Sequence, residues 1–405
     1  MNEKFKKIRN IIIIICLIVL LIDIVILVKG KLTKKEKAFF DSINSFEKSD
    51  DDIIAVGSNT DNKESYEKAK ITLYNDKYEK KWEKFYNTKY RSSFLAVKKD
   101  NDSYVAVGNY EANKKEHKSS LRSALIVKYD KEGNVINKKY FQVLGNSKFT
   151  NLLVVDDGYI VIGQSIYENM VLGTSTEGGA FIIKYDKNLK EIWKKNYGGS
   201  KSGIYNDLLI LDNNIYVVGK DSSRLGIISK YDLDGNYIDT ATYKITDTFG
   251  FTGVATDNDY LYVVGSKKVK DDENSYDTDA LIVKYDKDLN KILENSYRGK
   301  GMERFNKIIL DDKSNLVIVG QTGVYNKKKS TSSLNVFSYD GILAKYNTSL
   351  KKLLIENYGN SEDDYLTDIK NINGKYVLSG YSTYKNNYMS KFITYTESGK
   401  LIEVK

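Results

Sequence analysis

Residues 197–219 read YGGSKSGIYNDLLILDNNIYVVG, and similar stretches recur from about residue 39 to the end of the chain. Each copy ends an apolar run on a glycine, and a second apolar run of the type ALIVKYD then ends at a tyrosine. The glycines are Gly57, Gly108, Gly163, Gly219, Gly265, Gly320 and Gly380, and the tyrosines are Tyr74, Tyr129, Tyr185, Tyr231, Tyr285, Tyr346 and Tyr395. The two sets alternate strictly, so the chain carries seven copies of one unit.

The spacing of these two anchors is rigid in one half of the unit and loose in the other. Each tyrosine is followed by the next glycine after 34 residues, or 35 in one case, whereas each glycine is followed by the next tyrosine after 12 to 26 residues. A constant length is typical of strands joined by tight turns, where an insertion would shift the sheet register, and a variable length is typical of surface loops.

The constant half has the pattern of β-structure. In the quoted copy, segments 207–212 and 214–218 precede the variable stretch, and 226–231 and 237–243 follow it on either side of the turn YDLDGN. Four short strands every 46–60 residues is the cadence of propeller blades. We therefore predict an all-β fold in which residues 39–405 form a seven-bladed β-propeller of four-stranded blades.

The sequence leaves the closure of such a ring open. The first unit begins near Phe39 and the last ends at Lys405, so no spare strand remains to latch the two ends together. The stretch 33–48, TKKEKAFFDSINSFEK, is compatible both with a short amphipathic helix and with the first inner strand.

The units resemble the β-propeller repeats of bacterial surface-associated proteins, which run from a Tyr-Gly-Gly-Ser turn through a Val-Val-Gly strand to a Lys-Tyr-Asp strand. Segments 197–219 and 280–297 carry the likeness, which covers nearly all of 37–405. It implies an architecture and no single activity. The family's Trp after the Lys-Tyr-Asp turn is kept at Trp82 and Trp193, and the chain lacks the Trp-Asp dipeptide of WD repeats.

The N-terminal segment is typical of a membrane anchor. Residues 11–28 read IIIIICLIVLLIDIVILV, which is long enough for a spanning helix, and Asp23 does not outweigh seventeen apolar neighbours. No small-residue cleavage pattern follows, as a signal peptide would require. We predict a basic tail at 1–9, a signal anchor at 10–28 and a linker at 29–38, ahead of the propeller.

The sequence is compatible with two orientations of this anchor, because positive charge flanks both ends of the apolar run. A short basic N-terminus favours a cytoplasmic tail with the propeller outside the cytoplasm, at the cell membrane. The competing arrangement holds the tail outside and the body in the cytosol.

Charge and composition exclude several functions. The net charge is +9, but residues 1–37 alone carry nine Lys and Arg against three Asp and Glu, so the other 368 residues are nearly neutral. Nucleic-acid binding therefore does not fit. Cys16 is the only cysteine and His117 the only histidine, which argues against a disulfide framework, a thiolate or histidine metal centre and a histidine triad. We expect no cofactor and no metal.

The acidic and basic residues of the sequence do not point to a metal site or a catalytic site. Asp-rich turns such as 232–236 are better explained as hairpin turns than as calcium loops, because the position that should carry Glu holds Tyr243. The acidic clusters 50–52, 271–273 and 362–364 are explained by solvated loops. Five arginines of the body are scattered over different units: Arg91, Arg122, Arg224, Arg298 and Arg304.

The variable connections are the best candidates for a binding surface. If the glycine strand is second and the Lys-Tyr-Asp strand third in each blade, these connections emerge on one face of the ring. They carry the aromatic residues Tyr110, Tyr167, Tyr276, Tyr325, Phe337 and Tyr339. Exposed aromatic side chains are enriched in binding sites. We predict a non-enzymatic module that binds a protein or a cell-envelope polymer through this face.

A hydrolase is the alternative function. Glycoside hydrolysis requires only two carboxylates, so an extracellular glycan-acting enzyme with carboxylates at the centre of the ring is compatible with this composition. Two carboxylates about 5–10 Å apart in a central pocket would favour the hydrolase, and a ring without such a pocket would favour binding.

Overall fold

The computed structural model describes residues 39–60, 66–86, 90–111, 122–141, 146–166, 168–169, 174–175, 179–197, 203–243, 250–269, 277–299, 301–325, 337–359, 363–384 and 387–405. Phe39–Lys405 forms one compact unit. The predicted tail, anchor and linker at 1–38 lie outside the described residues. Within the described ranges no helix has the length and apolarity needed to cross a bilayer.

Twenty-eight strands of the described residues form four-stranded antiparallel sheets, which confirms the four-strand unit. The first three sheets contain β1 (Asp41–Ser49), β2 (Asp52–Asn59), β3 (Lys68–Tyr74) and β4 (Lys80–Phe85); β5 (Ser92–Asp100), β6 (Ser103–Glu111), β7 (Arg122–Asp130) and β8 (Val135–Phe141); and β9 (Asn146–Val155), β10 (Gly158–Ile166), β13 (Ala180–Asp186) and β14 (Glu191–Tyr197). The next two contain β15 (Ile204–Leu211), β16 (Asn214–Lys220), β17 (Gly226–Asp232) and β18 (Tyr237–Tyr243); and β19 (Gly250–Thr256), β20 (Leu261–Lys268), β21 (Thr278–Tyr285) and β22 (Lys291–Tyr297). The last two contain β23 (Gly301–Leu310), β24 (Leu316–Tyr325), β25 (Phe337–Tyr346) and β26 (Lys352–Tyr358); and β27 (Asp364–Ile372), β28 (Lys375–Tyr384), β29 (Asn387–Thr396) and β30 (Leu401–Val404).

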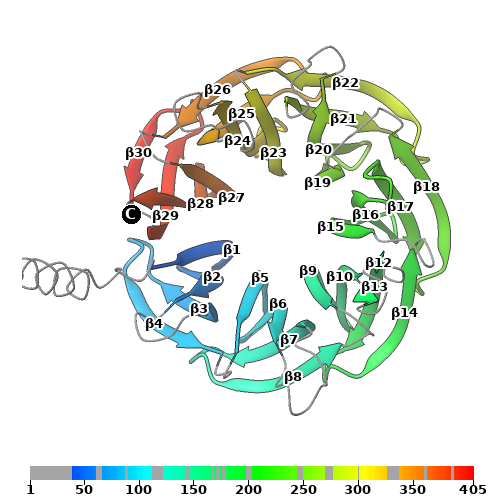
Figure 1. Ribbon diagram of the computed structural model, residues 1–405, viewed down its shortest axis with the longest axis vertical. Helices are drawn as coiled ribbons and strands as arrows, with labels where there is room; N and C mark the ends of the chain where they lie inside the picture. The colour runs from blue at the N-terminus through cyan, green and yellow to red at the C-terminus, as the bar shows by residue number, and fades with distance from the viewer. Residues whose placement is uncertain are drawn as a thin grey trace, which may run out of the picture. The chain divides into compact units, whose positions relative to one another are not determined.

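The sheets stand around a central axis as a ring, with the first strand of each sheet innermost and the fourth outermost (Figure 1). Strands pair in chain order within each sheet. A single parallel bridge, Thr278 to Met302, joins the sheet of β19–β22 to that of β23–β26. The short strands β11 (Glu168–Asn169) and β12 (Thr174–Ser175) pair with each other outside the ring of sheets.

The repeat tyrosines pack in the core between neighbouring sheets. Each apolar cluster joins two adjacent sheets, and each contains one of these tyrosines, as Tyr129 does between the β1–β4 and β5–β8 sheets. All seven side chains are between 1% and 6% exposed. The tyrosine recurs because its large ring fills the gap between twisted sheets that stand side by side.

The repeat glycines are required by a β-bulge in the first strand. Each first strand shifts register opposite the glycine, as between Phe305 and Lys307, and brings a carbonyl oxygen over the second strand. A Cβ at Gly320 would lie 2.1 Å from the Arg304 oxygen, and at the other six glycines this distance would be between 1.9 and 2.3 Å. Since real Cβ atoms do not come so close to a carbonyl oxygen, this position requires glycine.

The ring closes without exchanging a strand, because its first and last sheets are each built from consecutive strands. Phe40 forms a parallel bridge with Tyr388, and the Phe39 oxygen accepts a hydrogen bond of 2.8 Å from the Tyr388 amide. Phe392 packs between Phe46 and Tyr78 of the first sheet. The first inner strand begins at Asp41. Of the two structures that the sequence allowed for this stretch, a helix or a strand, residues 41–48 therefore form the strand.

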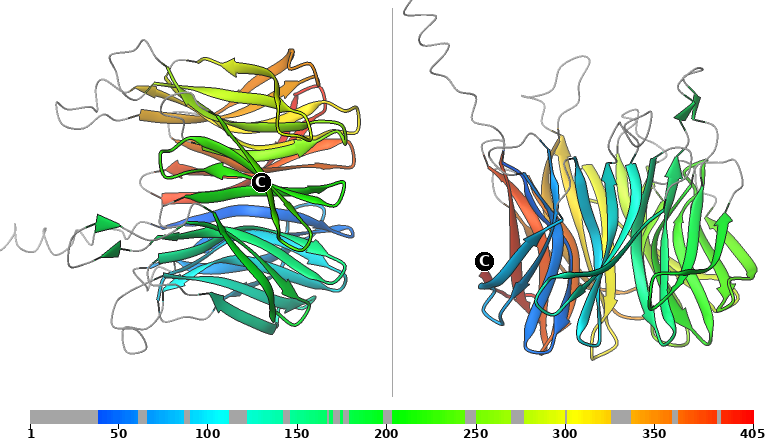
Figure 2. Two further views of the ribbon diagram at one scale, coloured as in Figure 1. Left: turned by 90° about the vertical axis from the view of Figure 1, so that its right-hand side faces the viewer. Right: turned by 90° about the horizontal axis from the view of Figure 1, so that it is seen from below.

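The two rims of the ring differ in their connections, and Figure 2 shows the strands running from one rim to the other. One rim, here the turn face, carries the short turns between the first and second and the third and fourth strands. The other, here the loop face, carries the variable second-to-third connections and the links between sheets. This confirms that the glycine strand is second, that the Lys-Tyr-Asp strand is third and that the variable connections share one face.

A belt of hydrogen bonds joins the inner strands to one another. In six of the seven inner strands, the residue that follows the partner of the repeat glycine is an Asn or a Thr. Its side chain donates a hydrogen bond to a carbonyl oxygen of the next inner strand. The bonds are Asn44 to Phe94 (2.7 Å), Thr150 to Tyr205 (2.5 Å), Asn206 to Phe251 (2.7 Å), Thr252 to Phe305 (2.6 Å), Asn306 to Leu366 (2.9 Å) and Thr367 to Ile43 (2.7 Å). Leu95 holds the equivalent position in β5 and cannot donate, so the belt is interrupted between β5 and β9.

Candidate functional site

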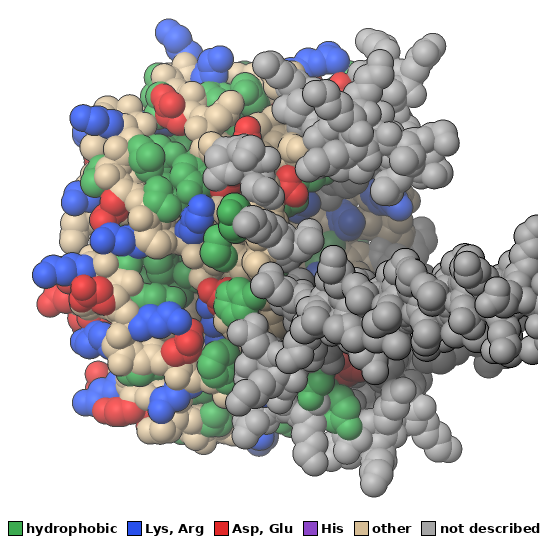
Figure 3. Space-filling model, turned by 60° about the vertical axis from the view of Figure 1, so that its left-hand side comes forward, with side chains coloured by type: hydrophobic (Ala, Val, Ile, Leu, Met, Phe, Trp, Pro, Cys, Tyr) green, Lys and Arg blue, Asp and Glu red, His purple; other side chains and the backbone are tan. Residues whose placement is uncertain are grey.

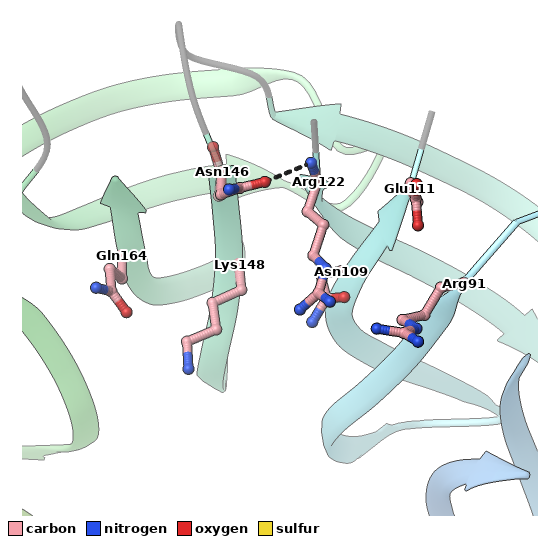
Figure 4. A pocket seen from close by; sticks show the side chains of 8 residues that line it. Arg91, Asn109, Glu111, Arg122, Asn146, Lys148 and Gln164 are labelled. Atoms are coloured by element: carbon pink, nitrogen blue, oxygen red, sulfur yellow. Dashed lines mark hydrogen bonds between the residues drawn. The ribbon is translucent and has the colours of Figure 1, made fainter. Parts of the chain in front are cut away.

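A pocket on the loop face lies between the β5–β8 sheet and the β9–β14 sheet, next to the interruption of the belt. We call it the rim pocket; it has a volume of about 560 Å³. It is lined by Arg91, Asn109, Glu111, Arg122, Asn146, Ser147, Lys148 and Gln164. Figure 4 shows these polar side chains around one open space. Three cations face one carboxylate, so the pocket is suited to an anionic ligand.

A smaller cavity of about 140 Å³ lies at the centre of the ring. All the belt side chains and Leu95 line it, together with charged residues such as Lys307 and Asp368. Its charges form a compensated network. Lys307 contacts both oxygens of Asp207 at 2.8 Å, and Glu47 pairs with Lys98 at 2.7 Å and with Lys370 at 3.6 Å.

Two central carboxyl groups, those of Asp368 and Glu47, have lowered pKa values, which does not suit a general acid. Burial opposes ionisation of Asp368 and Glu47, but the nearby lysines, Lys370 foremost, lower the pKa of both carboxyl groups. Asp368 also accepts hydrogen bonds from Ser45 Oγ (2.9 Å) and the Phe46 amide (3.2 Å). A glycosidase acid needs a raised pKa, so the geometry of the centre does not favour the alternative hydrolase.

Carboxyl groups with raised pKa values lie elsewhere, toward the loop-face ends of β21, β23 and β25. Burial raises the pKa values of Asp279, Glu303 and Asp340, and nearby acids add to the effect for the last two. Asp279 Oδ1 and Glu303 Oε2 are buried without a hydrogen-bond partner. Glu303 instead uses its other oxygen to accept from Thr322 Oγ1 at 2.7 Å.

Two of the predicted aromatic residues, Tyr110 and Tyr339, have described side chains, and they lie in different groups. Tyr110 contacts Tyr140 of the same sheet, with the two rings tilted and their centroids 4.3 Å apart, and packs against the cluster between the first two sheets. Tyr339 belongs to a different group, in which it contacts Tyr365, which in turn stacks on Tyr381. Both residues are half-buried.

The remaining aromatic predictions are only partly located. Tyr325 and Phe337 pair with each other at the loop-face end of β24 and β25. Their side chains are not among those that the structure describes. Tyr167 and Tyr276 lie outside the described residues, as does His117. A binding role for the six aromatic residues stays a prediction.

The Asp-rich turns have the predicted structural role. Asp232 accepts hydrogen bonds from the Asn236 amide (2.7 Å) and from its side chain (2.8 Å), closing the hairpin. Trp193, which follows the third-strand turn of its sheet, packs against Gly235 in the turn of the next sheet: a Cβ built on Gly235 would lie 2.8 Å from the indole.

Sequence reasoning missed a group of cations that the fold assembles. Arg91 and Arg122 looked scattered in the sequence but line the same pocket, together with Lys148. Lys148 and Arg304 each precede the bulge aromatic of an inner strand, Phe149 and Phe305. If the seven repeats are aligned at Phe149 and Phe305, the position before these aromatic residues holds a cation in two repeats, Lys148 and Arg304.

The comparisons with known proteins concern the fold alone. No protein family matches the chain, and no curated protein matches it in sequence. The WD40 domain of Pan2 from Neurospora crassa is similar in structure, with 9% identity, a TM-score of 0.51 and coverage of 86% of this chain and 88% of that one. The β-propeller domain of the Trilobed protease from Pyrococcus furiosus, described as having an open velcro topology, has 11% identity, a TM-score of 0.50 and coverage of 91% and 95%. Residues 39–405 therefore have a β-propeller fold.

Proposed function

We propose that this chain is a membrane-anchored, seven-bladed β-propeller that binds a protein or a cell-envelope polymer through its loop face and is not an enzyme. Residues 10–28 serve as the anchor in this proposal, and residues 39–405 stand outside the cytoplasm. The repeat count, the consecutive four-stranded sheets and the contact between the first and last sheets support the number of blades.

One observation carries the binding function: the loop face combines the variable connections with an open, charged pocket. The central cavity is small and its charges compensate one another, whereas the rim pocket has four times the volume and an excess of cations. A recognition surface needs groups that are free to meet a ligand, and the loop face supplies them.

Photo-crosslinking in intact cells tests the binding face. A photoreactive phenylalanine analogue replaces Tyr384 at the loop-face end of β28 or Tyr237 on the turn-face side, which are 51% and 58% exposed. We expect adducts of higher mass from position 384 and none from position 237. Adducts from 237 alone, or from neither position, would contradict binding through the loop face.

Proteolytic shaving of intact cells tests the topology. Mass spectrometry should recover peptides from residues 100–400 in the released fraction. Protection of the whole chain would place the propeller in the cytosol and reverse the proposed orientation.

A further inference from the structure

Several cations toward the loop face have no ion pair within the part of the chain that the structure describes, among them Arg91, Arg122, Lys148, Lys220 and Arg304. Some other cations toward the loop face are paired, among them Lys267 and Lys391. Lys70, for example, is 1% exposed and pairs with Asp41. Exposed lysines such as Lys77 and Lys351 also form no ion pair among the described residues, but water solvates them. Lys148, Lys220 and Arg304 differ because burial lowers the pKa values of all three side chains.

Three of them, Lys148, Lys220 and Arg304, lie toward the loop-face ends of β9, β16 and β23, and we call them the mouth cations. Phe149 and Phe305 are fully buried between sheets. Because side chains alternate along a strand, Lys148 and Arg304, one residue earlier, lie on the opposite side of the strand from that packed layer. Each lies on the loop-face side of a residue that lines the central cavity.

Lys220 reaches the same region over a glycine. It ends β16, and a Cβ built on Gly250 of the next inner strand would lie 2.5 Å from Lys220 Cβ. Gly250 also has a φ of +88°, which other residues rarely adopt. The absence of a side chain at Gly250 leaves the space along which Lys220 passes.

The positive charges of the mouth cations repel one another. Burial, then the positive charges of Lys220, Arg122 and Arg304, lower the pKa of the Lys148 ammonium. Burial, then Arg304, lowers that of Lys220, and burial lowers that of Arg304. Arg304 Nε is buried with no hydrogen-bond partner. Buried charges are normally paired, so an unpaired group of cations suits a site that an anion completes.

We propose that Lys148, Lys220 and Arg304 bind a phosphate group of a phosphate-rich polymer, and that Arg91 and Arg122 in the rim pocket bind a further phosphate group of the same chain. The proposal rests on the proposed function, because it gives the chemistry of the ligand that the loop face would bind.

Phosphate fits better than a carboxylate for two reasons. Three cations around one group favour a multiply charged anion, and the planar guanidinium of Arg304 matches the geometry of phosphate oxygens. A polymer fits better than a single ion, because Arg122 links the mouth cations to the rim pocket: it lines that pocket and its charge acts on Lys148.

Calorimetry with the full-length protein in a non-ionic detergent tests this. The probes are inorganic tripolyphosphate, long-chain inorganic polyphosphate, poly-L-glutamate and a single-stranded oligonucleotide. The site variant is K148Q/K220Q/R304Q. The matched control is K77Q/K131Q/K351Q, which removes three exposed lysines from turns of the turn face and makes the same change in net charge.

We expect polyphosphate to bind more tightly than poly-L-glutamate or the oligonucleotide. The site variant should bind polyphosphate roughly ten- to a hundredfold more weakly, because each charge-assisted hydrogen bond contributes substantially, and the control should bind as the parent does. The dependence of affinity on salt should also be shallower in the site variant. Equal binding by the parent and the site variant, or preference for poly-L-glutamate or the oligonucleotide, would overturn the proposal.

Thermal unfolding without ligand gives a second readout. Because the mouth cations repel one another, the site variant should unfold at the same temperature as the parent or higher. A clearly lower temperature would show that these side chains stabilise the folded protein, and would overturn the proposal.

The two proposals can fail separately. Specific phosphate binding by the purified protein, combined with loop-face positions that give no adducts in cells, would contradict the proposed function and leave the phosphate site standing. Adducts from position 384 together with unchanged phosphate affinity in the site variant would do the opposite.

Discussion

The turn face and the loop face are built at opposite ends of the same strands, yet their charges are organised differently. On the turn face, Asp100 accepts a hydrogen bond from Tyr159 and pairs with Lys187, and Asp311 does the same with Tyr376 and Lys345. On the loop face, the mouth cations have no such partners among the described residues. Figure 3 shows acidic and basic side chains interspersed on the outer wall. Paired charges therefore tie the sheets together on the turn face, and the site that we propose for a ligand lies on the other rim.

The largest expected effect comes from breaking the turn-face network at Asp311. Asp311→Ala leaves Lys345, which is 8% exposed, without its carboxylate. Leaving a buried charge unpaired is expected to lower the free energy of unfolding by about 3–5 kcal/mol. Urea unfolding measures it. The control is Asp312→Ala in the same turn, whose side chain is exposed; equal losses in the two variants would refute a special role for the network.

Acid should weaken the turn face through the same residue. Burial opposes ionisation of Asp311, but hydrogen bonds, from Tyr376 foremost, lower its pKa from 3.8 to about 2. A depressed pKa contributes stability that is present above the unfolded value and is lost as the pH falls through the folded value. The parent should therefore lose stability between about pH 4 and pH 2 more steeply than Asp311→Ala, as urea unfolding at each pH would show. Parallel pH profiles would contradict this.

A smaller effect is expected at the belt, which ties the inner strands between the two faces. Thr252→Val keeps the shape of the side chain but removes the donor to the Phe305 oxygen. The free energy of unfolding should fall by about 1–2 kcal/mol. Thr242→Val, on the outer strand β18, is the comparison, and an equal loss there would show that the belt bond is not responsible.

The smallest effect is a gain at the one junction where the belt is interrupted. Leu95→Thr places a hydroxyl where it can donate to the Phe149 oxygen, as Thr252 does to Phe305. We expect a stabilisation of about 0.5–1 kcal/mol relative to Leu95→Ala, which has no donor. If Leu95→Thr is no more stable than Leu95→Ala, the interruption of the belt does not weaken this junction.

The repeat architecture was predictable because its requirements are local and recur. A bulge that brings a carbonyl over the second strand admits only glycine at positions such as Gly320, and the space between sheets calls for the ring of Tyr346, so both leave a periodic signal. The prediction of four strands per unit and of variable connections on one face followed from that period and was confirmed. The anchor at 10–28 stays a prediction.

The candidate site depended on the tertiary structure. Lys148, Lys220 and Arg304 lie in different sheets, and no spacing in the chain marks them as neighbours. Only the fold brings their charges close enough to act on one another, and it gives them no anionic partner among the residues that the structure describes. Tyr110 and Tyr339, which the sequence grouped as one binding surface, went into separate clusters. The sequence alone determined where strands, turns and loops occur, because hydrogen bonding and packing within a sheet act over short stretches. Which side chains meet at the axis was decided by the fold, because that depends on how far each sheet is rotated around the ring.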